Sequence, residues 1–138
     1  MEGCALISFN FRLIDNKPYK IPVQNLSRVY GNLLESGNKE KANQLIEGYL
    51  KNPSSYEAIE RDFNRLGYQF LRLQKTDNSL STFASATLLF PNSSNIYDSY
   101  GEALLQSGKK EEAIKMYQKS LELNPDNENG KKVLKELL

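Results

Sequence analysis

The stretch YDSYGEALLQSGKKEEAIKMYQKSLELNP, Tyr97–Pro125, decides the fold because it contains a complete helix-turn-helix pattern. In its first part, apolar or small residues stand three, four and seven positions after an aromatic one, which defines one face of an α-helix. These residues are Tyr97, Tyr100, Gly101 and Leu104. Because glycine inside a helix costs about 1 kcal/mol relative to alanine, we expect Gly101 to lie where a second helix approaches closely.

The rest of this stretch supplies a turn and a second helix. Gly108 is predicted to end the first helix. Ala113 is the expected small residue where the two helices cross, and Tyr117 is the large side chain that fills the space beside it. Pro125 is predicted to end the second helix, because proline restricts the residue before it and cannot continue the hydrogen-bond ladder.

The same pattern occurs 34 residues earlier, in FNRLGYQFLRLQKTDNSLSTFASATLLFP. Residues 34 positions apart in the two copies are of similar size or have the same role in the backbone. The pairs are Phe63/Tyr97, Leu66/Tyr100, Gly67/Gly101, Phe70/Leu104, Phe83/Tyr117, Ala86/Ser120 and Pro91/Pro125. A period of 34 residues is that of the tetratricopeptide repeat, a helix-turn-helix unit, and both copies resemble this family. The resemblance implies a solenoid of stacked helix pairs.

A third, weaker copy precedes these two. The run LLESGNKEKA, residues 33–42, matches residues 104–113 almost term for term, although Tyr30 stands where a small residue is expected. The sequence therefore predicts an all-α solenoid of the tetratricopeptide type. It would have about three repeats, at residues 23–56, 60–93 and 94–127.

Both ends of the chain depart from the repeat. Residues 128–138 form an amphipathic pattern with Val133, Leu134 and Leu137 on one side, which predicts a capping helix over the open end of the last repeat. Phe9, Phe11 and Leu13 alternate with other residues in a strand-like way. We therefore expect residues 1–22 to be a short extended arm, either strand or irregular, before a repeat domain at residues 23–138.

Composition narrows the function. The 138 residues contain 18 basic and 17 acidic side chains, a balance that does not favour nucleic acid as a partner. The absence of histidine and the single cysteine, Cys4, argue against zinc sites, disulfides and histidine-dependent nucleophiles. No apolar run approaches the length of about 20 residues that a membrane-spanning helix needs. We expect no metal, no cofactor and no membrane span.

A small serine hydrolase is the enzymatic alternative. Ser36–Lys39 and Ser107–Lys110 both match S-x-x-K, a pattern found in penicillin-recognising enzymes. Both matches fall in the same turn of two different repeats, where Ser, Gly and Lys are ordinary turn residues. The sequence also lacks room for the mixed α/β scaffold and the oxyanion hole of such enzymes. We therefore expect the chain not to be an enzyme.

The family resemblance implies that the first helices of the repeats line a concave surface that binds peptides or proteins. The positions flanking the core stripe of these helices then form a candidate protein-binding groove. They are Arg61, Asn64, Tyr68, Arg72, Asp98, Glu102 and Gln106. Solvated surface is the alternative interpretation of these residues. A Lys/Asn/Arg clamp for a terminal carboxylate, found in many family members, is disfavoured because Ser27, Gly31, Asp98 and Glu102 occupy its positions.

A narrower resemblance covers residues 60–138. The words FPNS and YDS-GEA are similar to the repeat region at the C-terminus of bacterial esterases of the α/β-hydrolase class and of β-lactamase-like serine hydrolases. It implies a non-catalytic module that binds a protein, such as its own upstream hydrolase domain. The alternative is a self-associating module that forms a homodimer. A complete chain would be cytoplasmic, and a fragment of an exported hydrolase would be periplasmic or exported.

Overall fold

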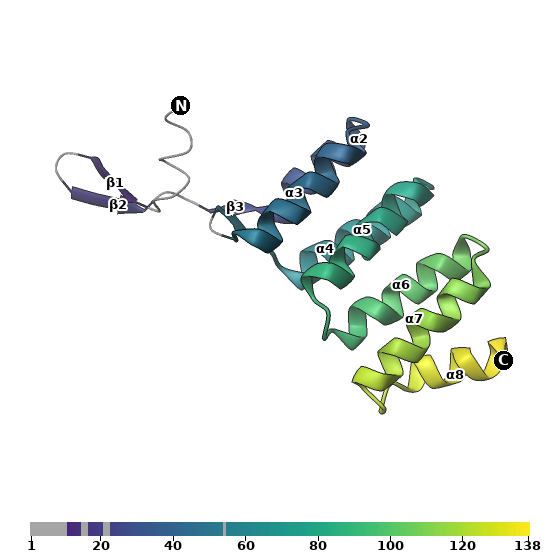
Figure 1. Cartoon of the computed structure of the whole chain (residues 1–138). Helices are drawn as coiled ribbons and strands as arrows, with labels where there is room; N and C mark the ends of the chain where they lie inside the picture. The colour runs from purple at the N-terminus through teal and green to yellow at the C-terminus, as the bar shows by residue number, and fades with distance from the viewer. Residues whose placement is uncertain (1–10, 15–16, 21–22, 54) are drawn as a thin grey trace. The chain divides into compact units, whose positions relative to one another are not determined.

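The structure is a computed structural model that describes residues 11–14, 17–20, 23–53 and 55–138 (Figure 1). It divides into two compact units, Met1–Ile59 and Glu60–Leu138. Cys4 and Phe9, on which the sequence raised expectations, lie outside the described residues. Among the described residues, no helix is both long enough and apolar enough to cross a lipid bilayer.

The first unit begins with two short strands. Strand β1, Phe11–Ile14, pairs antiparallel with β2, Lys17–Lys20, and Phe11 lies opposite Lys20. The extended arm predicted from the alternating pattern is therefore a strand over residues 11–14. Residues 17–20, which belong to the same predicted arm, are extended because they pair with this strand.

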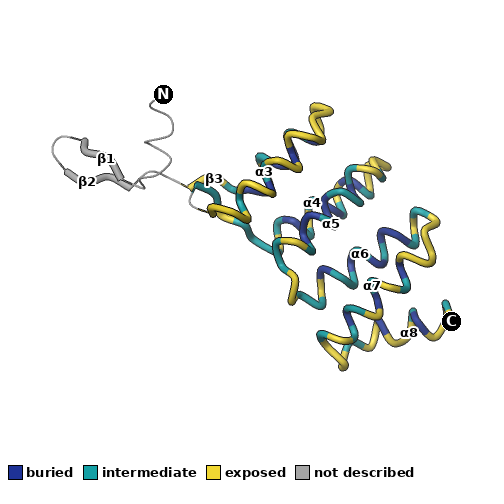
Figure 2. The backbone as a smooth tube through the Cα atoms, in the orientation of Figure 1, coloured by how far each residue is buried: buried dark blue, intermediate teal, exposed yellow. Residues whose placement is uncertain are grey.

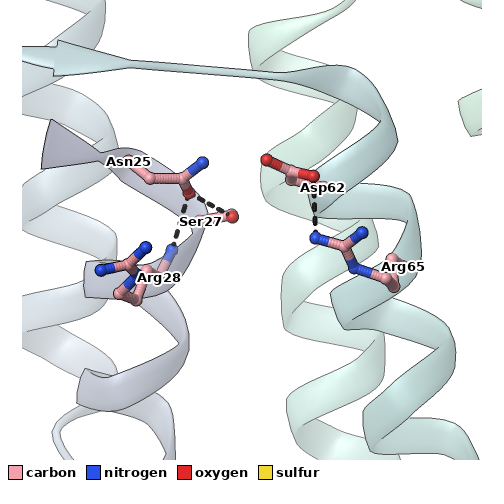
Figure 3. Close-up of polar contacts among 5 residues, drawn as sticks. All are labelled: Asn25, Ser27, Arg28, Asp62 and Arg65. Atoms are coloured by element: carbon pink, nitrogen blue, oxygen red, sulfur yellow. Dashed lines mark hydrogen bonds and ion pairs between the residues drawn. The ribbon is translucent and has the colours of Figure 1, made fainter. Parts of the chain in front are cut away.

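One helix pair completes the first unit. Helix α2 spans Leu26–Glu35 and α3 spans Lys39–Lys51. Asn25 caps α2: its Oδ1 accepts hydrogen bonds from the Arg28 backbone N–H at 3.1 Å and from Ser27 Oγ at 2.6 Å (Figure 3). Strand β3, Gln24–Asn25, pairs in parallel with β4, Tyr56–Glu57, and so joins the segments before α2 and after α3.

The second unit contains five helices with a strict spacing. They are α4 Glu60–Arg72, α5 Thr76–Leu89, α6 Ser94–Gln106, α7 Lys110–Leu123 and α8 Glu128–Leu137. Both bounds of α6 and of α7 lie 34 positions after the corresponding bounds of α4 and α5, as the sequence period predicts. Helix α8 begins 34 positions after α6, so the capping helix takes the place of a first helix.

The repeated glycines lie at close helix approaches. A Cβ atom on Gly67 would meet the Phe83 ring at 2.5 Å, and one on Gly101 would meet the Tyr117 ring at 2.8 Å. Both rings are almost fully buried. In α4 and α6 the glycine therefore makes room for the aromatic residue of the following second helix, which confirms the packing role expected for Gly101.

The turns inside the repeats use a left-handed residue. Gly108, between α6 and α7, has φ +78°, and Gly37, between α2 and α3, has φ +80°. The corresponding position between α4 and α5 is occupied by Gln74, at φ +60°. Hydrogen bonds from Gln74 N to Leu71 O and from Gly108 N to Leu105 O, both 3.0 Å, show that the two turns have the same geometry.

The core of the second unit follows the stripe read from the sequence (Figure 2). Aromatic contacts run through it: Phe83 packs edge-on against Tyr68 and stacks on Tyr100. Ser79 replaces the alanine of the next repeat, Ala113, and satisfies its buried hydroxyl by donating to the Gly67 carbonyl at 2.8 Å. The apolar side chains buried here are Phe63, Phe70, Phe83, Ala86, Ile96, Ala103, Leu104, Ala113, Tyr117 and Leu134.

Candidate protein-binding face

The candidate face lies on two successive first helices of the second unit. Arg61, Asn64, Tyr68 and Arg72 belong to α4, and Asp98, Glu102 and Gln106 belong to α6. We call these seven residues the first-helix face. Arg61, Arg72 and Gln106 are exposed, and the other four are partly buried.

Tyr68 and Glu102 join the two helices. The Tyr68 hydroxyl donates a hydrogen bond to Glu102 Oε2 at 2.6 Å, and Gln106 Nε2 donates to Glu102 Oε1 at 3.2 Å. The ring of Tyr68 packs edge-on against Phe83, with 5.4 Å between ring centroids. Because its ring and its hydroxyl are both held, Tyr68 has a fixed position on the face.

The electrostatic field of the two carboxylates reaches the neighbouring phenols. Burial, followed by the hydrogen bond to Glu102, raises the pKa of the Tyr68 phenol well above its usual value, and a hydrogen bond with Ser99 opposes the shift. Burial, together with the charges of Asp98 and Glu102, raises the pKa of Tyr117 to about 12. Both phenols are therefore neutral at neutral pH, and the Tyr68 phenol is the one that donates to Glu102.

Asp98 is tied to the capping helix. Its Oδ1 accepts from Asn127 Nδ2 at 2.8 Å, and its Oδ2 accepts from Asn129 Nδ2 at 2.9 Å. Asn127 also caps α8, since its Oδ1 accepts from the Gly130 backbone N–H at 3.1 Å, and it donates to Ser120 Oγ at 2.9 Å. Neither asparagine was among the residues predicted from the sequence. Asn127 lies 34 positions after Ser93, the N-cap of α6, so the repeat period could have identified it.

The other three residues of the first-helix face, all on α4, take no part in these hydrogen bonds. Arg61 and Arg72 lie near the two ends of α4 with exposed side chains. Asn64 Oδ1 is buried and has no hydrogen-bond partner within the described part of the chain. Asp62 and Arg65, on the same helix, form an ion pair at 2.9 Å (Figure 3). The structure thus brings Tyr68, Glu102 and Gln106 together through hydrogen bonds, while Asp98 contacts α8 instead.

The two carboxylates of the face have neutral hydrogen-bond partners. Their donors are a phenol and three amide side chains. Within residues 23–53 and 55–138, no lysine or arginine forms an ion pair with Asp98 or Glu102. In the same ranges no three His, Cys, Asp or Glu side chains cluster as they would to hold a metal ion. The arrangement is suited to recognition by hydrogen bonds and charge.

Comparison with known proteins supports this fold. Residues 101–127 match the sequence model of the tetratricopeptide repeat. A small glutamine-rich tetratricopeptide repeat-containing protein 2 from Mycosarcoma maydis is 32% identical over 72 residues. That match takes in 52% of this chain and 20% of the relative, so the chain spans about a fifth of the relative's length.

Solved structures of tetratricopeptide repeat proteins have a similar fold. A point mutant of MamA is similar with a TM-score of 0.60 and 19% identity, over 81% of this chain and 80% of that one. The first tetratricopeptide domain of human RPAP3 is similar with a TM-score of 0.54 and 23% identity, over 81% of this chain and 86% of that one. The first tetratricopeptide domain of Spaghetti (RPAP3), solved bound to the HSP90 peptide SRMEEVD, is similar with the same TM-score of 0.54. The fold is an α-solenoid of the tetratricopeptide type.

Proposed function

We propose that this chain is a non-catalytic protein–protein interaction module that binds a protein or peptide on the first-helix face. The observation that carries the proposal is the hydrogen bond between Tyr68 and Glu102, which fixes an aromatic side chain and a charged one on adjacent first helices. Binding surfaces are enriched in tyrosine and arginine anchors held in defined positions. Tyr68 supplies the first kind of anchor, and exposed Arg72, at the end of the same helix, supplies the second.

The partner is proposed to have mixed polarity. Asp98 and Glu102 favour lysine, arginine or N–H groups opposite α6, whereas Arg61 and Arg72 favour carboxylates near the ends of α4. An acidic peptide such as SRMEEVD would bring its carboxylates toward two acidic side chains that form no ion pair with a lysine or arginine of the described residues. We therefore propose that this chain does not share the peptide of the RPAP3 structure.

A neighbouring domain of the same protein is the more specific partner that we propose. The support is the resemblance, read from the words FPNS and YDS-GEA alone, to the repeat regions that follow bacterial hydrolase domains. In that arrangement the chemistry resides in the neighbouring domain, and this chain contributes only the docking surface. A homodimer would use the same kind of surface between two copies.

The experiment is a titration against immobilised peptides of basic, acidic and mixed sequence, with SRMEEVD among the acidic ones. Arg72→Ala should weaken the best mixed-sequence binder by about 1–3 kcal/mol, and Tyr68→Phe, which removes only the hydroxyl, by about 0.5–1.5 kcal/mol. Tyr68→Phe is chosen over alanine because it keeps the ring on Phe83. Lys119→Ala, on α7, is the control, since Lys119 is outside the face and pairs with neighbouring Glu122.

Two results would contradict the proposal. One is unchanged binding in both face variants together with a loss in Lys119→Ala. The other is SRMEEVD binding as tightly as the mixed peptides. Sedimentation of the same samples distinguishes a homodimer, which would form without peptide and dissociate in the Tyr68→Phe variant.

A further inference from the structure

The chain contains one Asn-Gly sequence, Asn129-Gly130, and it lies in the first turn of α8. Glycine after asparagine leaves the backbone least hindered, because glycine has no Cβ and adopts most backbone conformations. The backbone nitrogen of the glycine can then attack the side-chain amide carbon of the asparagine. An Asn-Gly pair is therefore the position in a chain most prone to deamidation.

Both reacting groups, the side-chain amide of Asn129 and the backbone N–H of Gly130, form hydrogen bonds in the structure. Asn129 is exposed, and its Nδ2 donates to both oxygens of Asp98, at 2.9 and 3.2 Å. The Gly130 N–H donates to Asn127 Oδ1 at 3.1 Å. Helical backbone geometry adds a third restraint, because it turns the next residue's nitrogen away from the side-chain amide carbon. While α8 is docked, the attack is blocked.

We propose that Asn129 is a deamidation site whose reaction is gated by the opening of α8, and that the product then keeps α8 from docking. When the first turn opens, the Gly130 nitrogen bonds to Asn129 Cγ, its proton passes to Asn129 Nδ2, the Cγ–Nδ2 bond breaks, and ammonia leaves. Water then opens the cyclic imide to aspartate or isoaspartate. Water is the only co-reactant, and no oxidation or reduction occurs.

In the deamidated product, the attractive contact between residue 129 and Asp98 becomes repulsive. An amide that donates two hydrogen bonds becomes a carboxylate that faces another carboxylate, and Asp98 is partly buried, so the repulsion is incompletely screened. An acidic residue in the first helical turn gains from the helix dipole, but the repulsion between two carboxylates in direct contact is larger than this gain. Release of α8 uncovers the apolar cluster that Leu134 forms with Leu104 and Tyr117.

The gating is tested by peptide mapping and mass spectrometry of the full chain incubated at neutral pH. Asn127→Ala removes the cap and Asp98→Ala removes the acceptor of Asn129, so each should open α8 more often and speed deamidation of Asn129 about fivefold. Asn129→Gln should remove the signal. Equal rates in the wild type and both opening variants would overturn the gating, as would an Asn129 that stays intact in all of them.

The effect of the product is tested by amide hydrogen exchange in α8. Asn129→Asp should speed exchange on the order of tenfold, while exchange in α6 and α7 stays unchanged. The exchanged pair, Asp98→Asn with Asn129→Asp, restores one donor and one acceptor and should return α8 to within about twofold of the wild type. Unchanged exchange in Asn129→Asp, or no recovery in the double variant, would contradict the repulsion.

Discussion

Tyr68 donates a hydrogen bond to Glu102 at 2.6 Å, and these two residues stand 34 positions apart, which is one full period of the repeat. They therefore occupy the same position in two successive first helices. A repeat that placed the same side chain at both positions would set two tyrosines or two carboxylates side by side. The divergence of this one position from tyrosine to glutamate produces the contact that joins the helices.

Tyr68→Phe should lower the free energy of unfolding by about 0.5–1.5 kcal/mol, because Glu102 Oε2 loses its donor while the ring stays packed. Urea unfolding followed by circular dichroism measures the change. Glu102→Gln keeps an acceptor for the phenol and is the matched variant, with a smaller loss. If Tyr68→Phe were as stable as the wild type, the hydrogen bond would contribute nothing.

Stability should also fall in alkali. The pKa of the phenols of Tyr68, Tyr100 and Tyr117 is raised in the fold, mainly by burial. Their unfolded forms ionise near pH 10, so stability is complete below about pH 10 and decreases above it, where the unfolded state has lost protons that the fold retains. Unfolding midpoints measured at intervals above that pH should decline less steeply in Tyr68→Phe. An identical slope in the variant and the wild type would contradict the raised pKa.

The repeated glycines give a sharp comparison. Gly67→Ala should destabilise the protein by about 1–3 kcal/mol, since its Cβ would meet the Phe83 ring at 2.5 Å and that ring is fully buried. Gly101→Ala, against Tyr117, should behave similarly. Gly48→Ala is the control, because Gly48 lies in α3 with no atom within 4 Å of its added Cβ. It should stabilise by about 1 kcal/mol through helix propensity alone, and thermal unfolding of all three should separate the two signs.

Period and composition predicted the helix pairs, the turn at Gly108 and the close approach at Gly101, because each depends on residue type and spacing within one repeat. The contact between Tyr68 and Glu102 depends instead on the distance between two helices, which no single-helix pattern contains. The sequence placed both residues on the face without predicting that they pair.

The hydrogen bonds of Asp98 are a second contact between helices that the sequence pattern did not predict. The sequence predicts a charged side chain free for a partner, whereas the structure commits its oxygens to Asn127 and Asn129 of the capping helix. The amphipathic pattern of residues 128–138 identified the helix by its apolar side. It carried no information on the polar residues of its first turn, which attach the helix to α6.

A substitution in the turn between α4 and α5 should make the protein more stable. Gln74 adopts φ +60°, a conformation that costs a non-glycine residue about 1 kcal/mol or more, and the next repeat has Gly108 at the same position. Gln74→Gly should stabilise by about 0.5 kcal/mol after the greater freedom of glycine in the unfolded chain is subtracted. Gly108→Gln should destabilise by a similar amount. Chemical denaturation checks both, and shifts of the same sign would show that the two turns are not equivalent.

Asn127 should be the most sensitive polar residue of the capping helix, because it performs two tasks. Its Oδ1 caps α8 at Gly130, and its Nδ2 donates to Asp98 and Ser120. Asn127→Ala removes both and should cost about 1–2 kcal/mol. Asn127→Ser keeps a cap acceptor but loses the amide nitrogen that donates to Asp98 and Ser120, so it should cost about 0.5–1 kcal/mol. Urea unfolding measures the free energy of unfolding of both variants. If both lost the same free energy, the hydrogen bonds to Asp98 and Ser120 would contribute nothing beyond the cap.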